Sequence, residues 1–148
     1  MNSPILSICI PTYNRATYLD ETINSIVTQK RFFETDDVEI VISDNCSQDE
    51  TETIVKKYIN IFADKIRYYR NPINIKDSNY EKVLRYGNGL FLKLNNDTLN
   101  HKENTLDVMI DAINKNIKSK TIIFFSNGTS GKHLSTFRCN DLNSFIKV

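Results

Sequence analysis

The stretch that decides the fold is residues 7–29, SICIPTYNRATYLDETINSIVTQ. Apolar, β-branched residues run from Ile5 to Ile10 and predict a short buried strand that Pro11 ends. Apolar residues then recur at helical spacing from Leu19 to Val27, which predicts an amphipathic helix. The stretch therefore predicts a strand that leads into a helix, with the sequence Pro-Thr-Tyr-Asn-Arg at the turn between them.

The same alternation of strand and helix continues along the chain. Four more apolar runs predict strands at residues 38–43, 65–70, 90–94 and 121–126. Four capping-box pairs predict helix starts: Thr17 with Asp20, Ser47 with Glu50, Ser78 with Glu81, and Asn100 with Glu103. Strict alternation with apolar strands predicts the α/β class, as a doubly wound, mainly parallel sheet with helices on both faces. Residues 1–148 are expected to form a single domain.

Composition excludes several classes of protein. The 148 residues carry a net charge of +1, which gives no electrostatic case for binding nucleic acid. No apolar run approaches the roughly 20 residues of a transmembrane segment, and the N-terminus does not resemble a signal peptide. The three cysteines are odd in number and lack CxxC spacing, which fits a reducing cytoplasm rather than a disulfide framework or a zinc site. His101 and His133 are isolated, and we interpret them as solvent-facing.

Polar clusters follow each of the first four predicted strands. They occupy residues 11–15, 44–49, 71–74 and 95–97. Any one of them fits an ordinary α/β loop. Because parallel topology gathers the carboxyl ends of strands at one edge, where such sheets bind ligands, the clusters are expected to meet there. Their side-chain types suit a nucleotide.

Each part of a nucleotide has a candidate partner in these clusters. Tyr13 and Pro11 offer a surface for a base, and Asp44 can accept a hydrogen bond from a ring N–H, since the Ser47 and Glu50 capping box leaves it free. The chain has no GxGxxG and no GxxxxGK[ST] loop, so a diphosphate needs a metal or cationic side chains. Asp97 can hold Mg²⁺ or Mn²⁺ through oxygen, beside the neutral oxygen donors Asn95 and Asn96. Arg15 and Lys76 are cationic supplements.

Four segments, SICIPTYNRATYLDETINSIVTQ, EIVISDNCSQDETETIVKKY, IRYYRNPINIKDSN and LFLKLNNDTL, together resemble the family-two glycosyltransferases with the GT-A fold. The resemblance is nearest to bacterial enzymes that build surface polysaccharide or lipopolysaccharide. It implies transfer of a sugar from a nucleotide-diphosphate sugar to a hydroxyl of a saccharide or lipid-linked saccharide, assisted by Mg²⁺ or Mn²⁺ and with inversion. It also implies a cytoplasmic protein, which can be peripheral to the inner membrane.

The resemblance also assigns the site residues. It implies that Asp44 recognises the base, that Asn96 faces the ribose, and that Asp97 holds the metal. The residues expected to bind the nucleotide sugar are Pro11, Thr12, Tyr13, Arg15, Asp44, Asn45, Ser47, Lys76, Asn95 and Asn96.

The chain departs from the family pattern in three ways. Asn95 and Asn96 stand where acids are common, and Lys76 stands where a glycine is frequent, so that Lys76 either contacts a phosphate or is simply solvated. The chain is also short. We expect it to hold the donor half without the acceptor-binding half and its general base, so the catalytic residue is unknown. Apolar surface left uncovered by that half would favour a homodimer. The alternative function is a non-catalytic nucleotide-binding or interaction module.

Overall fold

The strands of the structure are all parallel and lie in the order β3-β2-β1-β4. Their bounds are Leu6–Thr12 for β1, Val38–Asp44 for β2, Ile66–Arg70 for β3 and Phe91–Leu94 for β4. The computed structural model describes residues 3–118, and the strand expected at 121–126 lies outside them. The predicted α/β class with a parallel sheet is confirmed.

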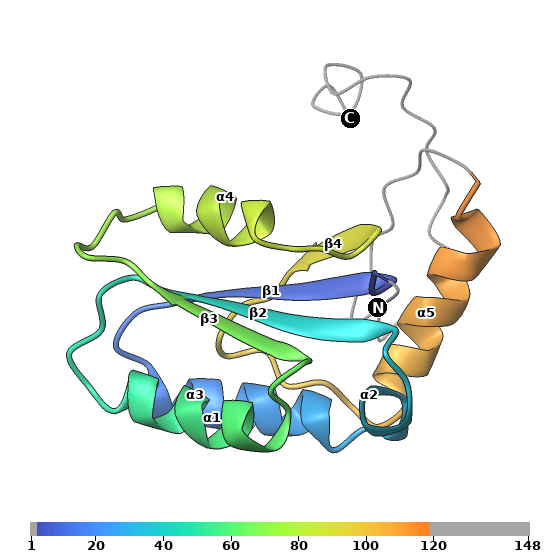
Figure 1. The fold of residues 1–148 in the computed structure, drawn as a ribbon, viewed down its shortest axis with the longest axis horizontal. Coiled ribbons are helices and arrows are strands. Elements are labelled where there is room, and N and C mark those ends of the chain that lie inside the picture. Colours follow the sequence, from blue (N-terminus) through green and yellow to red (C-terminus); the bar gives the residue numbers. More distant parts are fainter. Residues whose placement is uncertain (1–2, 119–148) are drawn as a thin grey trace, which may run out of the picture.

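Helices cover both faces of this sheet. They are α1 (Ala16–Val27), α2 (Lys30–Glu34), α3 (Thr51–Ile61), α4 (Ser78–Arg85) and α5 (Thr105–Asn116). In Figure 1, α1 and α3 lie below the sheet, α4 lies above it, and α2 and α5 lie together at one end. Helix α2 is not predicted from the sequence, because five residues with only Phe32 buried show no helical periodicity. Among the helices of residues 3–118, none has the length and apolar character needed to cross a membrane.

The main hydrophobic core lies on the α1 and α3 face of the sheet. Alternate residues of the two central strands point into it, because side chains in a strand alternate between faces. Phe32 and Phe62 meet edge to face within it, with ring centroids 5.5 Å apart. The largest fully buried members are Leu6, Ile8, Ile10, Leu19, Ile23, Ile26, Phe32, Ile40, Ile42, Ile66, Leu106 and Ile110.

The α4 face of the sheet is partly polar, contrary to the expectation of wholly apolar strands. Glu39 is 7% exposed and accepts two hydrogen bonds of 3.0 Å from the guanidinium of Arg67. The same carboxylate accepts hydrogen bonds from the Ser7 hydroxyl at 2.6 Å and from the Asn88 backbone N–H at 2.7 Å. A buried charge is tolerated when it is paired and its lone pairs are filled, which is the case here.

Pro11 does not end the first strand as expected, since β1 continues to Thr12. The backbone of Cys9 bonds toward β4, and that of Thr12 bonds toward β2. Because backbone polar groups alternate in direction, position 11 faces the β4 side. Pairing with β4 ends at Cys9 opposite Leu94, so the missing N–H of proline removes no bond from the ladder.

The four predicted capping boxes are wrong. The cap positions are Arg15, Glu50, Asp77 and Asn104, and none of these residues makes a side-chain capping bond. For two of these helices, α1 and α3, Asp49 supplies such a bond instead. One carboxylate oxygen accepts from the Thr51 N–H at 3.1 Å, and the other accepts from the Ala16 N–H at 3.0 Å. A single carboxylate thus accepts from one N–H at the start of α3 and from one at the start of α1.

The close approach of residues 87–89 to β1 generates a stability prediction. A Cβ on Gly89 would lie 2.5 Å from the backbone nitrogen of Ser7, whereas one on Gly87 would meet the terminal methyl of Leu92. A backbone atom of a central strand cannot move aside as a side chain can. We expect Gly89→Ala to lower the free energy of unfolding by about 3 kcal/mol, and Gly87→Ala by about 1 kcal/mol. Urea unfolding of both variants measures the difference, and equal losses would contradict it.

Candidate functional site

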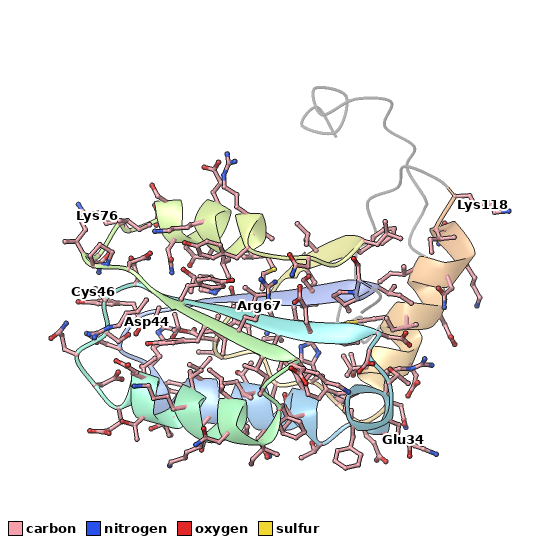
Figure 2. The ribbon with its side chains drawn as sticks, viewed as in Figure 1. Glu34, Asp44, Cys46, Arg67, Lys76 and Lys118 are labelled. Carbon is pink, nitrogen blue, oxygen red and sulfur yellow. The ribbon has the colours of Figure 1, made fainter. Side chains whose placement is uncertain are left out.

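A cavity of about 390 Å³ opens at the carboxyl edge of the sheet. The loops after β1, β2 and β3 come together at the left of Figure 1, where Figure 2 labels Asp44, Cys46 and Lys76. Strand order reverses between β1 and β4, which makes this the switch point at which open α/β sheets bind ligands. The lining residues are Pro11, Thr12, Tyr13, Arg15, Asn45, Asn74, Lys76, Asp77, Asn79, Tyr80, Asn96, Asp97 and Thr98.

Hydrogen bonds between the loop after β1 and the loop after β2 fix one wall of the cavity. The Asn45 N–H donates to the Thr12 carbonyl at 2.9 Å, and the Asn14 N–H donates to the Ser47 hydroxyl at 2.9 Å. The side-chain oxygen of Asn14 accepts from the Gln48 N–H at 2.7 Å. These bonds extend the contact between β1 and β2 beyond the strand ends. The loop that carries Tyr13 is therefore fixed by hydrogen bonds to the loop after β2.

Asp97 is the most constrained carboxylate of the cavity. The Thr12 hydroxyl donates to its Oδ2 at 2.9 Å, Arg15 approaches its Oδ1 at 3.4 Å, and the Thr22 hydroxyl donates to its backbone carbonyl at 3.0 Å. Burial raises the pKa of Asp97 above its usual range, while the bond from Thr12 and the charge of Arg15 act in the opposite direction. Residues 85 positions apart are thereby held together across the switch point.

Asparagine side chains hold the opposite wall, between β3 and α4. Asn45 donates to the side-chain oxygen of Asn74 at 2.8 Å, and the same oxygen accepts from the Lys76 N–H at 2.8 Å. Asn79 is buried and bonds Ser43 twice, through the hydroxyl at 2.7 Å and the carbonyl at 2.8 Å. Lys76 has φ 54°, the left-handed region that favours glycine, so its backbone is strained while its exposed side chain borders the cavity.

The cavity brings together most of the residues expected from the sequence. Three of the expected nucleotide-sugar residues, Asp44, Ser47 and Asn95, lie outside its lining. The members that do line it are Pro11, Thr12, Tyr13, Arg15, Asn45, Lys76 and Asn96, together with Asp97. Their roles in binding remain predictions.

The expectation that Asp44 is left free by a neighbouring cap is wrong. Its side chain is fully buried, and Oδ1 accepts from the Ser47 N–H at 2.8 Å. Oδ2 accepts from the Tyr68 hydroxyl at 2.6 Å, and Arg70 lies 3.6 Å away. Asp44 therefore organises the base of the loop after β2.

The interpretation of His101 as solvent-facing is also wrong. Its ring is partly buried, and Nε2 lies 2.9 Å from the side-chain oxygen of Asn95. Asn95 itself is fully buried behind the cavity. His133 lies outside the described residues.

Sequence reasoning did not assign a site role to five of the lining residues: Asn74, Asp77, Asn79, Tyr80 and Thr98. Tyr80 belongs to α4 and is 46% exposed. The buried positions of α4 are Asn79 and Val83, four residues apart. Because one of these buried residues is polar, the pattern of apolar residues alone misplaces the buried face of α4. The four-residue spacing of Asn79 and Val83 was the signal in the sequence that could have located that face.

The oxygen donors at this edge of the sheet fit a divalent cation only if a bound phosphate supplies some of the ligands. Within residues 3–118, no cluster of three or more His, Cys, Asp or Glu side chains could hold a metal on its own. Asp97 supplies one carboxylate and Asn96 an amide oxygen beside it. Mg²⁺ is often held by one or two carboxylates together with substrate phosphates, and this arrangement suits that case.

The sequence profile of glycosyl transferase family 2 matches residues 7–139. The chain belongs to this family. Over 86 residues it is 43% identical to the abequosyltransferase RfbV of Salmonella typhimurium, a match that covers 57% of this chain and 25% of that protein. It is 37% identical over 75 residues to the poly(ribitol-phosphate) β-N-acetylglucosaminyltransferase TarS of Staphylococcus aureus, which covers 51% of this chain and 11% of TarS.

Solved structures place this family-2 chain in the GT-A fold. Residues 1–349 of S. aureus TarS superpose with a TM-score of 0.71 at 25% identity, covering 88% of this chain and 38% of that one. A mannosyltransferase from Pyrobaculum calidifontis, solved with GDP-Man and Mn²⁺, has a TM-score of 0.65 at 21% identity and covers 76% of this chain and 33% of that one. The second likeness concerns the fold alone. The chain thus spans 25% of the length of RfbV and 38% of this TarS structure.

The partly buried position of His101 in this family-2 chain predicts a pH dependence. Burial and the charge of Lys93 lower the pKa of His101 from 6.5 to about 4. As the pH falls from 6.5 toward 4, the unfolded chain gains a proton that the folded chain does not, so the free energy of unfolding decreases. Urea unfolding at several pH values should show a shallower decrease in His101→Gln, since the carboxylates titrate in both proteins. Parallel curves would contradict the prediction.

Proposed function

We propose that this chain forms the donor-binding part of a glycosyltransferase that takes its sugar from a nucleotide-diphosphate sugar. The observation that carries the proposal is the cavity at the switch point, where Tyr13, Arg15, Lys76 and Asp97 converge from separate loops. Family membership supports the reaction class, and related chains have been solved with UDP and UDP-GlcNAc.

Aromatic side chains border the cavity from two directions and suit a nucleoside. Tyr13 comes from the loop after β1 and is 43% exposed, and Tyr80 comes from α4 and is 46% exposed. Exposed aromatic rings beside a cavity offer flat apolar surface on which a base can stack, with hydroxyl groups at the wet end. Asn45 and Asn96 add amide groups that can bond a base or ribose.

Cationic groups suit the diphosphate. Arg15 and Lys76 both border the cavity, on the sides of α1 and α4 respectively. Asp97 and Asn96 would hold Mg²⁺ or Mn²⁺ together with phosphate oxygens, and a bound ion would offset the charge of the departing diphosphate. Arg15 pairs with Asp97, so its guanidinium lies beside the expected phosphate position.

The names of the relatives support a proposal for the acceptor and the wider setting. The name of RfbV describes it as an abequosyltransferase, and the name of TarS gives poly(ribitol-phosphate) as its acceptor. We infer a bacterial surface saccharide or lipid-linked saccharide as the acceptor, with inversion at the anomeric carbon. A general base outside the donor half, a cytoplasmic location near the inner membrane and a homodimer remain predictions.

A non-catalytic nucleotide-binding module is the second candidate function. Asp97 is the one acid among residues 95–97, where family members commonly have several, and this favours the module because it weakens metal binding. Release of sugar from the matching nucleotide sugar supports an enzyme, and tight binding without release supports a module.

The first test is a thermal-shift panel of UDP, GDP, CDP and dTDP, each with and without Mn²⁺. We expect one nucleotide to raise the Tm of the unchanged chain, and Mn²⁺ to increase that shift. Asp97→Asn keeps the hydrogen bond from Thr12 but removes the charge, so it should weaken the Mn²⁺-dependent part by at least about tenfold in affinity.

Asp64→Ala is the matched control for this panel, because Asp64 is an exposed acid outside the cavity. It should leave the shifts unchanged. A panel without any shift in the unchanged chain would refute the proposed donor site.

Lys76 provides a second test, since strain and charge there have opposite effects. Lys76→Gly relieves the left-handed backbone and should raise the free energy of unfolding by about 0.5–1 kcal/mol. It also removes a cation, so we expect the affinity for the nucleoside diphosphate to fall about fivefold while the affinity for the nucleoside stays the same. Isothermal titration calorimetry and urea unfolding measure the two effects.

Two further variants separate strain from charge at this position. Lys76→Met keeps the strain and loses the charge, so it should lose diphosphate affinity without gaining stability. Lys57→Met removes an exposed lysine on α3, away from the cavity, and should change neither quantity. Unchanged diphosphate affinity in both Lys76 variants would show that Lys76 is merely solvated.

A further inference from the structure

We propose that His101 and Lys93 are positioning residues for Asp97, and that they act through the buried side-chain amide of Asn95. The inference rests on the proposed function, because it assigns these residues to the same donor site. His101, Lys93 and Asn95 do not border the cavity, whereas Asp97 does.

The amide oxygen of Asn95 is held from one side by two donors. The Lys93 ammonium donates to it at 2.7 Å, and Nε2 of His101 lies 2.9 Å from it. An amide oxygen can only accept, so Nε2 of His101 must carry the hydrogen in this contact. Both donors oppose rotation of the Asn95 amide, which would bring its NH₂ group against them.

The amide nitrogen of Asn95 faces the turn that carries Asp97. It donates to the Asn96 carbonyl at 3.0 Å and lies 3.5 Å from the Leu99 carbonyl. The Leu99 N–H closes the same turn on the Asn96 carbonyl at 3.1 Å. Fixing the amide of Asn95 therefore fixes the backbone on both sides of Asp97.

A second series of hydrogen bonds links the backbone of His101 to Asp97. The His101 N–H donates to the Ser25 hydroxyl at 2.9 Å, and that hydroxyl donates to the Thr22 carbonyl at 2.7 Å. The Thr22 hydroxyl then donates to the Asp97 carbonyl at 3.0 Å. The backbone of Asp97 is thus held from α1 and from Asn95, while Thr12 and Arg15 hold its carboxylate.

Lys93 makes this arrangement unlike an ordinary structural ion pair. Within residues 3–118, the ammonium of Lys93 donates to the neutral amide of Asn95, and no carboxylate forms an ion pair with it. A partly buried cation without a counter-charge adds little to stability. Its orientation of the Asn95 amide gives the position a role in the site.

The test measures Mn²⁺-dependent binding of the nucleoside diphosphate that most stabilises the unchanged chain, among UDP, GDP, CDP and dTDP. His101→Phe keeps a ring of similar size but removes the N–H donor. We expect it to weaken Mn²⁺-dependent binding about tenfold, the scale found when residues that orient metal ligands are changed. His101→Gln can place an N–H near the same point and should stay within about twofold of the unchanged chain.

Lys93→Met separates positioning from stability. Methionine replaces a desolvated cation with an apolar chain of similar length, so Tm should not fall. Mn²⁺-dependent affinity should nevertheless fall about fivefold, since one of the two donors to Asn95 is lost. The variant also serves as the test if His101→Phe does not fold.

A double-mutant cycle with Asp97→Asn decides whether the effect passes through Asp97. If it does, His101→Phe adds no further loss of Mn²⁺-dependent affinity when Asp97→Asn is already present. An equal additional loss in that background overturns the inference, and so does unchanged affinity in both His101→Phe and Lys93→Met. If the unchanged chain binds none of the nucleotides, the proposed function fails, and the inference fails with it.

Discussion

The cavity depends on the backbone hydrogen bonding of β1, which pairs with β2 along its whole length but with β4 only over Leu6–Cys9. Parallel pairing directs every strand toward the same edge, and the placement of β4 beside β1 reverses the strand order there. Because β4 stops three residues before β1 does, the sheet opens on that side. The hydrogen bond from Thr12 to Asp97 spans the opening and sets the distance between the two loops.

The site has cationic side chains and few acids, so it carries less negative charge than a cluster of acids would give it. Asp97 faces Arg15, and Lys76 lies on the opposite wall. Where acids are common in the family, Asn95 and Asn96 leave the site with less negative charge to repel a diphosphate. The same substitution reduces its hold on a hard cation, so a metal would depend more on the oxygens of the donor.

Neutral amides do much of the structural work around the cavity. Asn45 joins the loop after β2 to Asn74 in the loop after β3, and Asn79 joins α4 to Ser43 of β2. Asn95 bonds the Asn96 carbonyl behind Asp97. An amide can satisfy buried backbone groups without the desolvation cost of a charge. These bonds satisfy the polar groups of the loops where they are buried, and they hold the strained backbone of Lys76 at both its N–H and its carbonyl.

The sequence by itself determined the fold class and the edge where the site lies. Alternating apolar runs and amphipathic stretches report on solvent exposure, which is a local property, and the topology of parallel strands then gathers Tyr13, Arg15, Lys76 and Asp97. Only the tertiary structure decided which polar groups pair with one another. Asp49 caps a helix 33 residues earlier, Asp44 is enclosed by Tyr68, and His101 bonds Asn95. Such partners are chosen by the packing of distant segments, and local spacing carries no record of that choice.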